Sequence, residues 1–570
     1  MYTTSTAFLD ALQDAGVSII FANLGSDHPA LVESLAEARA TGRPVPRLIT
    51  CPNEMVALSA AHGYAQVSGR AQAVVVHVEC GTQALAGAVH NVAKARIPAL
   101  IFAGASPFTQ EGELKGSRNE FIQWIQDVHD QRGLVRGYMK YDNEIRTGRN
   151  VRQLVNRAFQ LAYSDPKGPV YLMGAREVME EAVEPTGPLA WTPPLPPAPL
   201  PETAVEAIAG RLLAARRPLV VTSYLGRRHE AVAELLRLCD RLAVGVLESV
   251  SNYMNFPLTH PMHQGIAWNE PVQNEALAEA DYVLVLDSDI PWIPTVNRPN
   301  PQATIHHIDV DALKQQMPLW YIPAAGSFQA DVATALAQVN GRLDTLPADE
   351  RLVGERRAHY GARHQRLDGA LEALERPTDG GGVTPEYLVS RVRRFVDDNT
   401  IVLNEGITNY PVVMKHLRSG RPGGVFTSGG GSLGWNGGAA IGAKLAFPDK
   451  TVVALTGDGS YMFSVPSSVH WMARRYETPF VQIVFNNGGW RAPKFSTLAV
   501  HPDGYASRAD DIGVSFDPPS DYAGIAAASG GALGLTVHAA ADLDSALEEA
   551  FACVRTSKRA AVLDVQVPHL

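Results

Sequence analysis

The sequence predicts an α/β protein made of three doubly wound parallel-sheet domains. Short apolar runs alternate with helical stretches along the chain, which is the pattern of parallel strands joined by crossover helices. The length of 570 residues suits three or four domains of ordinary size. Two breaks in composition divide the chain into three parts of this kind.

The first part covers residues 1–184. Its expected strands are apolar on both faces, as buried parallel strands are, and they lie at residues 18–22, 73–78, 99–104 and 169–172. Residues 1–16 carry acidic residues and no basic segment, so we expect them to form an amphipathic helix and not a signal peptide.

Two linkers separate the three parts. Residues 185–201 contain eight prolines, a composition typical of an extended, semi-rigid spacer. The central part, residues 202–345, has expected strands at 218–222, 243–247, 282–286 and 305–309. Residues 346–382 form a charged helical linker that ends in three glycines.

The last part covers residues 383–570 and begins with a helix whose N-cap and first residue are Thr384 and Pro385. Its expected strands lie at 400–404, 452–455 and 480–485, and the last two end in polar, glycine-bearing turns. Ligands of open parallel sheets bind at the carboxyl ends of strands. We therefore expect the chemistry at these two turns.

Composition disfavours several classes of protein. The 49 basic and 59 acidic residues give a net charge of −10, whereas nucleic-acid binding needs clustered positive charge. No apolar run approaches the ~18 residues of a membrane span, so neither nucleic acid nor membrane is an expected partner. The four cysteines lie far apart without metal or disulfide spacing, which indicates a reduced, cytoplasmic protein.

The two turns offer oxygen ligands at one edge of the sheet. They are 457–460 (Gly-Asp-Gly-Ser) and 486–489 (Asn-Asn-Gly-Gly), with one expected helix, about residues 466–476, between them. Asp458, Asn487 and a glycine carbonyl, from Gly488 or Gly489, suit Mg²⁺. The glycines let a diphosphate approach the backbone. The plain alternative is two tight turns that merely end strands.

This pair of turns resembles the thiamine-diphosphate signature of the pyruvate decarboxylase, acetolactate synthase and benzoylformate decarboxylase superfamily. The resemblance extends over most of the chain and implies pyrimidine-binding, central and diphosphate-binding domains, in that order. It implies thiamine diphosphate and Mg²⁺ as cofactors, with the metal held by Asp458, Asn487 and Gly489. The other cofactor-binding residues that it implies are Asn404, Gly406, Thr408, Gly431, Leu433, Gly457, Gly459 and Ser460, where Leu433 supports the bent cofactor.

Three residues of the first part match catalytic positions of this superfamily. Glu54, before a helix that leads to Gly-Tyr-Ala, matches the glutamate that binds the cofactor's pyrimidine nitrogen; the plain alternative is a surface acid at a helix start. The motifs are most similar to benzoylformate decarboxylase, in which Ser26 and His77 match an active-site serine and the catalytic histidine. The second active-site histidine of that family has no counterpart in residues 290–294.

The resemblance implies a 2-oxo acid decarboxylase or carboligase, a lyase or transferase. Its product is an aldehyde or a 2-hydroxy ketone, formed through a decarboxylated enamine. The missing histidine favours carboligation, because a slowly protonated enamine lives longer. Family members place their active sites at subunit interfaces, so we expect a homodimer or homotetramer acting on a 2-oxo acid, with or without an aldehyde acceptor.

Other functions stay open. One is an acetolactate-synthase-like synthase or a carbon–carbon lyase, for which FAD in the central domain is undecided. Another is a catalytically silent paralogue with a regulatory role. A nicotinamide-dependent oxidoreductase ranks last, because no Gly-x-Gly-x-x-Gly turn is followed by an acid at the right distance. The role of residues 490–515 is also open.

Overall fold

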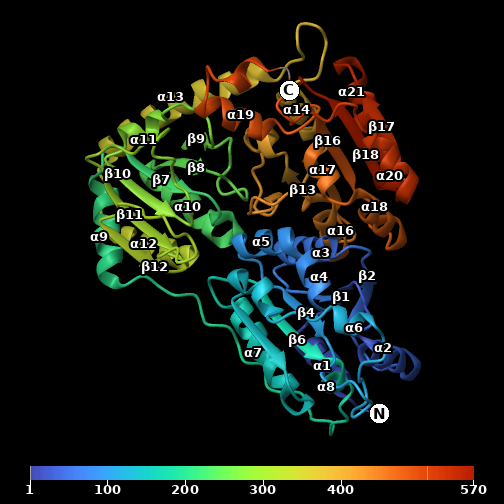
Figure 1. Ribbon diagram of the computed structural model, residues 1–570. Coiled ribbons are helices and arrows are strands. Elements are labelled where there is room, and N and C mark those ends of the chain that lie inside the picture. The colour runs from blue at the N-terminus through green and yellow to red at the C-terminus, as the bar shows by residue number, and fades with distance from the viewer. Residues whose placement is uncertain (1, 510, 570) are drawn as a thin grey trace.

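Three α/β domains form the chain, and the predicted fold class is confirmed (Figure 1). The structure is a computed structural model that describes residues 2–509 and 511–569. Each domain holds one six-stranded sheet, in which all the paired strands are parallel. None of the helices in these described ranges is long and apolar enough to cross a membrane.

The N-terminal domain has the strand order β2-β1-β3-β4-β6-β5. Every residue of β1 and β3 is buried, as their apolar sequences predict. Its strands are β1 Ile19–Ala22, β2 Arg47–Thr50, β3 Ala73–Val76, β4 Leu100–Ala105, β5 Tyr141–Ile145 and β6 Val170–Ala175. Its helices are α1 Thr4–Asp14, α2 Pro29–Thr41, α3 Glu54–Ser68, α4 Val78–Ala84, α5 Ala86–Lys94, α6 Ile122–Ile125, α7 Val151–Tyr163 and α8 Arg176–Glu180, with short 3₁₀ helices at Arg132–Leu134, Arg136–Tyr138 and Gly148–Asn150.

The central domain has the strand order β12-β11-β10-β7-β8-β9, so the direction of winding reverses between β7 and β10. Its strands are β7 Pro218–Thr222, β8 Gly245–Ser249, β9 His263–Ala267, β10 Tyr282–Leu286, β11 Thr304–Asp309 and β12 Gly326–Gln329. Its helices are α9 Glu202–Ala214, α10 His229–Leu242, α11 Glu275–Glu279 and α12 Val332–Leu343, with a 3₁₀ helix at Leu225–Arg227.

The C-terminal domain has the strand order β14-β13-β15-β16-β18-β17. Its strands are β13 Thr400–Glu405, β14 Val425–Thr427, β15 Thr451–Gly457, β16 Val481–Asn486, β17 Leu533–Val537 and β18 Ala561–Gln566. Its helices are α14 Pro385–Arg393, α15 Tyr410–Leu417, α16 Asn436–Ala446, α17 Asp458–Phe463, α18 Pro466–Arg475, α19 Arg491–Val500, α20 Tyr522–Gly530 and α21 Ala540–Thr556, with 3₁₀ helices at Ile407–Asn409 and Tyr505–Arg508.

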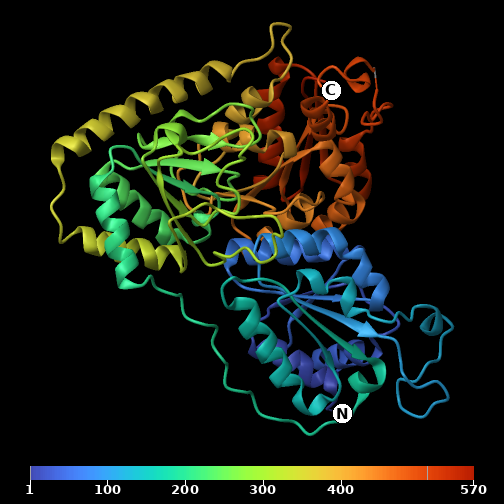
Figure 2. The same cartoon turned by 60° about the vertical axis from the view of Figure 1, so that its left-hand side comes forward.

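The two linkers differ in structure. Residues 185–200 contain no helix or strand and run along the outside of the molecule (Figure 1). The charged stretch forms the long helix α13, Glu350–Leu374, which extends over the central domain toward the C-terminal domain (Figure 2). Asp349 caps this helix by accepting from the backbone N–H groups of Arg351 and Leu352.

Helices α3 and α16 join the N-terminal and C-terminal domains. Glycines allow a close crossing, because a Cβ on Gly442 would lie 1.9 Å from the carbonyl oxygen of Ala60, and one on Gly438 would lie 2.9 Å from that of Val56. Asn53 caps α3 by accepting from the N–H of Val56 at 3.2 Å. The crossing therefore brings the first turn of α3 close to the start of α16.

Two local expectations are wrong. Two helices, α17 and α18, lie between the metal turns where one was expected, because α17 starts at Asp458 and Val465 interrupts the helical path with a φ of +54° before Pro466. Strand β3 ends at Val76, and His77 is the residue before α4 and not part of the strand. Asp458 and His77 therefore both lie at the N-terminus of a helix.

Candidate active site

Asp458 and Asn487 lie side by side because β15 and β16 are adjacent and in register, with Gly457 opposite Phe485. The Asp458 carboxylate accepts from the N–H of Gly459 at 2.7 Å and from the N–H of Gly489 at 2.9 Å. The Asn487 side-chain amide donates to the carbonyl oxygen of Gly489 at 3.0 Å. These contacts place the Asp458 carboxylate and the Asn487 side-chain amide on either side of Gly489.

The electrostatics of this turn suit a cation. Burial raises the pKa of Asp458, and no Lys, Arg or His of the described residues forms an ion pair with it. Within the same residues no three His, Cys, Asp or Glu side chains gather into a metal cluster. Asp458 is the one acidic residue of the turns 457–460 and 486–489, so neutral oxygens and the ligand's own phosphates would complete the coordination of Mg²⁺.

A buried hydroxyl at the same turn has no partner. Ser460 Oγ, in the first turn of α17, is buried and makes no hydrogen bond to the described residues. A buried polar atom usually has a partner, so this hydroxyl can donate to a phosphate oxygen at the start of the helix. The residues present therefore fit a diphosphate with a bound divalent cation.

The end of β13 forms the neighbouring wall. Asn404 Oδ1 accepts from the N–H of Gly406 at 3.1 Å, and a Cβ on Gly457 would lie 3.9 Å from the Gly406 carbonyl oxygen. Thr408 is half-buried in the short 3₁₀ helix that follows. The two predicted diphosphate loops, 404–408 and 457–460, are therefore adjacent.

Glu405 also belongs to this wall. It is fully buried and accepts from the N–H groups of Trp435 at 3.1 Å and Asn436 at 2.7 Å. Burial raises its pKa to about 7, and the backbone donors oppose that rise. Glu405 thus holds the start of α16, and with it the loop that precedes this helix.

That loop, 429–434, carries Gly431 and Leu433 and is attached to the N-terminal domain. His90 accepts from the N–H of Gly431 at 3.0 Å, and the Asn91 amide donates to the carbonyl oxygen of Ser432 at 2.8 Å. Leu433 itself is half-buried. Helix α5 therefore positions the loop that is predicted to support the cofactor.

Glu54 is the first residue of α3 and is half-buried. Its neighbour Met55 contacts the loop 429–434, since a Cβ on Gly434 would lie 3.1 Å from Met55 Cε. The same Cβ would lie 2.8 Å from the carbonyl oxygen of Phe463. A Cβ on Gly81 would lie 3.4 Å from Glu54 Oε1, so Glu54 also borders helix α4 behind His77.

His77 has a carboxylate partner that sequence reasoning missed. Asp27 Oδ1 lies 2.5 Å from His77 Nδ1, and Asp27 Oδ2 accepts from the N–H of Val78 at 3.1 Å. Glycines make this pair possible, because a Cβ on Gly25 would lie 2.0 Å from His77 Nδ1 and one on Gly104 would lie 1.8 Å from Asp27 Oδ2. The one sequence signal was the place of Asp27, directly after Ser26 in the turn that ends β1.

The contact shifts the pKa values of both His77 and Asp27. The hydrogen bond to Asp27 raises the pKa of His77, although burial opposes the rise. Burial alone would raise the pKa of Asp27, but the neighbouring His28 and His77 outweigh it, and the pKa is lowered. The carboxylate of Asp27 therefore favours the imidazolium form of His77.

The hydroxyl of Ser26 lies in the same turn, buried and without a hydrogen-bond partner among the described residues. The structure thus brings Ser26 and His77 together around Asp27. The second histidine in contact with Asp27 is the buried His28, at 3.1 Å, whereas residues 290–294, which follow β10 in the central domain, hold the buried Trp292 and no histidine. Helix α19, which covers much of the open stretch 490–515, has no buried residue.

Family models match all three domains of this geometry. They describe the thiamine pyrophosphate enzyme's N-terminal TPP binding domain over residues 2–134, its central domain over 205–339 and its C-terminal TPP binding domain over 406–565. The chain belongs to the thiamine pyrophosphate enzymes. The predicted family and order of domains agree with this result.

Curated relatives of this thiamine pyrophosphate enzyme have different activities. A sulfoacetaldehyde acetyltransferase of Castellaniella defragrans is 24% identical, over 99% of this chain and 93% of its own. A benzoylformate decarboxylase of Pseudomonas aeruginosa is 25% identical over 88% and 89%, and an acetolactate synthase large subunit of Lactococcus lactis is 23% identical over 81% and 76%.

Solved structures share the fold. A 4-hydroxybenzoylformate decarboxylase of Rhodococcus jostii superposes with a TM-score of 0.78 at 21% identity, covering 100% of both chains. A benzoylformate decarboxylase of Polynucleobacter necessarius gives 0.80 at 18% identity, covering 100% of this chain and 99% of that one.

Proposed function

We propose that the protein is a thiamine-diphosphate- and Mg²⁺-dependent 2-oxo acid decarboxylase or carboligase. One observation carries the proposal: Asp458 and Asn487, on adjacent turns, both contact Gly489, and the buried hydroxyl of Ser460, in the same turn as Asp458, has no partner among the described residues. Thiamine pyrophosphate relatives that include decarboxylases, synthases and acetyltransferases support the class.

The chain's residues would bind and orient the cofactor, which supplies the nucleophilic carbon and the electron sink. Asp458, Asn487 and Gly489 would hold Mg²⁺, and Ser460 and the loop at 404–408 would bind the diphosphate. Leu433 would support the bent cofactor between its rings. Glu54 would hydrogen-bond the pyrimidine nitrogen, at the end of α3 that faces the loop 429–434.

His77 and Ser26 would act on the substrate. With Nδ1 held by Asp27, Nε2 is the ring nitrogen of His77 that remains to deliver or take a proton. The free hydroxyl of Ser26 would bind the substrate carboxylate. The role of Asp27 would be to fix the orientation of the imidazole and keep it protonated.

The Asp27–His77 pair bears on the product. From the sequence alone, the missing second histidine favours carboligation. A protonated His77 acts in the other direction, because it supplies the proton that releases an aldehyde. We therefore propose aldehyde as the main product, with 2-hydroxy ketone formed when an acceptor aldehyde competes.

We propose that the central domain does not bind FAD at the switch point, where doubly wound sheets bind nucleotides. At the switch point between β7 and β10, Tyr224 is buried, with the Arg96 guanidinium 4.5 Å from its ring centre. Lys314 donates to the Tyr224 hydroxyl at 2.9 Å and to Asp309 at 2.6 Å. These side chains already interact with one another, so they leave no polar group to bind a flavin. We therefore infer that the purified protein lacks the yellow colour of a flavin.

We also propose a homodimer or homotetramer, with a second copy completing each active site. Phe108, Phe121 and Ile125 are exposed by 61%, 76% and 71% on the segment after β4. Gln126 of the same segment lies near His77 and contributes to the rise in its pKa. A second copy on this segment would cover the apolar side chains and shield His77 from water. The four free cysteines support a cytoplasmic location.

Carbon dioxide release from a panel of 2-oxo acids, including benzoylformate and pyruvate, tests the proposal. The assay contains thiamine diphosphate and Mg²⁺, and the products are identified by chromatography. We expect release from at least one acid, with aldehyde as the main product. Hydroxy ketone as the main product would favour the acetolactate-synthase-like alternative, and no release from any acid would favour a lyase of a preformed carbon–carbon bond or a silent paralogue.

A further inference from the structure

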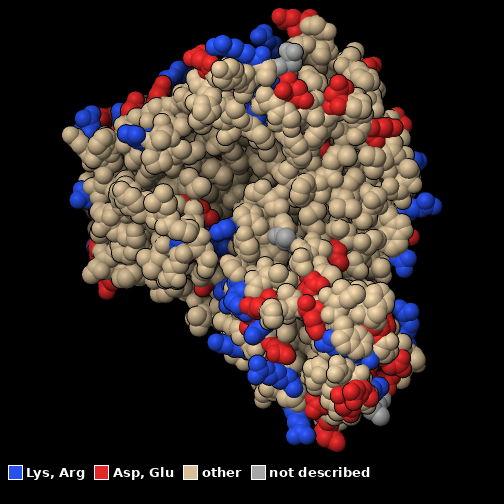
Figure 3. Space-filling view, viewed as in Figure 1, with Lys and Arg blue, Asp and Glu red and all other residues tan. Residues whose placement is uncertain are grey.

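A second pocket lies away from the candidate active site, between the N-terminal and central domains. Its volume is about 330 Å³. The N-terminal domain contributes the end of α5, the segment 137–140 and the turn 166–169, and the central domain contributes Asp289, Asp311 and residues 315–317. Figure 3 shows Lys and Arg side chains on the N-terminal domain next to the boundary between these two domains.

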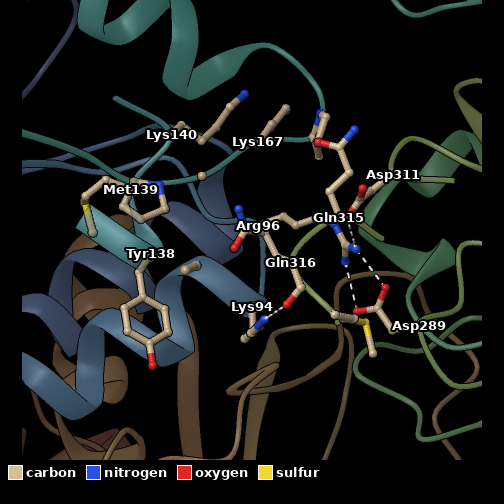
Figure 4. Close-up of a pocket in the computed structure, with 16 residues that line it drawn as sticks. Lys94, Arg96, Tyr138, Met139, Lys140, Lys167, Asp289, Asp311, Gln315 and Gln316 are labelled. Carbon is tan, nitrogen blue, oxygen red and sulfur yellow. Dashed lines mark hydrogen bonds and ion pairs between the residues drawn. The ribbon is translucent and has the colours of Figure 1, made fainter. Parts of the chain in front are cut away.

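Cations dominate one wall of this pocket. Lys94, Arg96, Lys140 and Lys167 come from the N-terminal domain, against two carboxylates from the central domain. In Figure 4, Arg96 reaches across toward Asp289 and Asp311, whereas Lys140 and Lys167 lie together on the other side. One side of the pocket thus holds Asp289 and Asp311, paired with Arg96, and the other side holds Lys140 and Lys167.

The carboxylates are already bound. Arg96 donates to Asp289 at 2.7 Å and 3.3 Å and to Asp311 at 3.3 Å. The buried Lys314 donates to Asp289 at 2.7 Å. Neither carboxylate therefore remains to neutralise the lysines.

The three lysines make no ion pair within 4.0 Å in the described part of the chain. Lys140 donates only to the carbonyl oxygen of Ser164, at 2.5 Å, and Lys94 only to that of Gln316, at 3.5 Å. Burial lowers the pKa of Lys140 to about 8 and also lowers that of Lys167. The carboxylate of Asp165, whose charge acts on both lysines, lies 3.4 Å from the Arg227 guanidinium. Half-buried amines without a counter-charge are costly, and an anion in the pocket would remove that cost.

We propose that this pocket binds a small metabolite that carries a phosphoryl dianion, held by Lys140, Lys167 and Lys94. Lysine is a common phosphate ligand, and two or three of them match the charge of a phosphate monoester. The volume is at the low end of the range for small-molecule sites. Phosphate esters of small metabolites fit this size, and a dinucleotide such as FAD is too large.

Calorimetric titration of the holoprotein, with thiamine diphosphate and Mg²⁺ present, tests the site. The probes are inorganic phosphate and glycerol 3-phosphate, with potassium chloride at equal ionic strength as the control for general salt effects. We expect binding at about millimolar affinity or tighter. Equal binding of both probes would show that the phosphoryl group suffices, and preference for the ester would show that the rest of the pocket also contacts the ligand.

Variants separate this site from the diphosphate turns. Lys167→Gln and Lys140→Gln should each weaken binding about tenfold, and Lys167→Arg should retain it. Lys115→Gln is the matched control, since it removes the same charge from a side chain that is 73% exposed on the same domain. Thermal unfolding of each variant checks that it folds.

Three results would overturn the proposal: no binding of either probe, an equal loss in Lys115→Gln, or a loss in Ser460→Ala without one in Lys167→Gln. The last result would place the anion at the diphosphate turns. Because the readout is binding and not turnover, failure here leaves the proposed decarboxylase activity untouched.

Discussion

Asp27 is the hydrogen-bond partner of His77 Nδ1. The carboxylate is held by the N–H of Val78 and faces Nδ1 of the imidazole at 2.5 Å, in a space that Gly25 and Gly104 keep open. Sequence analysis found His77 and Ser26 but not this partner, because a single aspartate after a strand gives no signal of which side chain it will meet. The contact depends on β1, β3 and β4 being neighbours in the sheet.

Replacing Asp27 by Asn should lower the pKa of His77, because its largest upward influence is the hydrogen bond to this carboxylate. The protonated imidazole would then be lost at a lower pH, so the alkaline limb of the activity profile should move to lower pH by about one unit. Histidine NMR titration measures the pKa directly, and Asp503→Asn is the exposed control. An unchanged His77 pKa would contradict the pairing.

The same pKa shift has a consequence for stability. A folded-state pKa above the unfolded value stabilises the protein fully below about pH 6.5, and this contribution is lost as the pH rises through the folded pKa. The wild type should therefore lose more stability than His77→Gln between pH 6 and pH 9, with these limits taken roughly around the reference value. Urea unfolding at several pH values measures the difference, and parallel curves for the two proteins would refute it.

Asp458→Asn should weaken binding of the cofactor with Mg²⁺ by roughly 10- to 100-fold. The amide cannot supply the one negative charge that the turn offers the metal. Titration of thiamine diphosphate followed by tryptophan fluorescence, with and without Mg²⁺, measures the loss. Ser460→Ala should show a smaller effect, and wild-type affinity in Asp458→Asn would remove Asp458 from the metal site.

At the scale of elements, the sequence predicted eleven of the eighteen strands in the described chain. Six of the seven missed strands lie at sheet edges: β2, β5, β9, β12, β14 and β17. Burial alternates along β12 and β17, so these two edge strands lack the continuous apolar runs by which buried strands are recognised, whereas the buried β14 is only three residues long. The seventh, β18, is interrupted by Asp564.

The crossing of α3 and α16 depends on small residues that periodicity does not reveal. Gly442→Ala should destabilise the protein by about 1–3 kcal/mol or more, because the new Cβ would overlap the Ala60 carbonyl, 1.9 Å away. Gly354→Ala in α13 is the matched control, since nothing lies within 4 Å of its Cβ; it should stabilise by roughly 0.5–1 kcal/mol. Chemical denaturation measures both, and equal effects would argue against a close crossing.

At the scale of the whole molecule, a surface hollow and a pocket lie between the domains. The visible face is hollowed between the central and C-terminal domains (Figure 3), and the lysine pocket lies between the central and N-terminal domains. The order of the three domains could be predicted from the two linkers and the metal turns.

The pocket could not be predicted from the sequence. Its lysines are separated by up to 73 positions, from Lys94 to Lys167, and only the packing of the domains brings them together.

The proposed assembly can be tested through the exposed apolar segment. Ile125→Glu should shift the protein to a smaller species and reduce its activity, because a buried charge at a subunit contact is costly. Leu319→Glu is the matched control, since Leu319 is fully exposed on the central domain. Light scattering after size-exclusion chromatography measures the mass, and a shift in both variants or in neither would exclude this segment as the contact.

The proposed role of Glu54 in activating thiamine diphosphate can be tested without knowing the substrate. The measurement is the rate at which the bound cofactor exchanges its C2 proton for deuterium, followed by NMR in Glu54→Gln and in the exposed control Glu120→Gln. We predict fast exchange in the wild type and in Glu120→Gln, and a loss of about 100-fold or more in Glu54→Gln with the cofactor still bound. Equal exchange rates in Glu54→Gln and the wild type would show that Glu54 does not activate the cofactor.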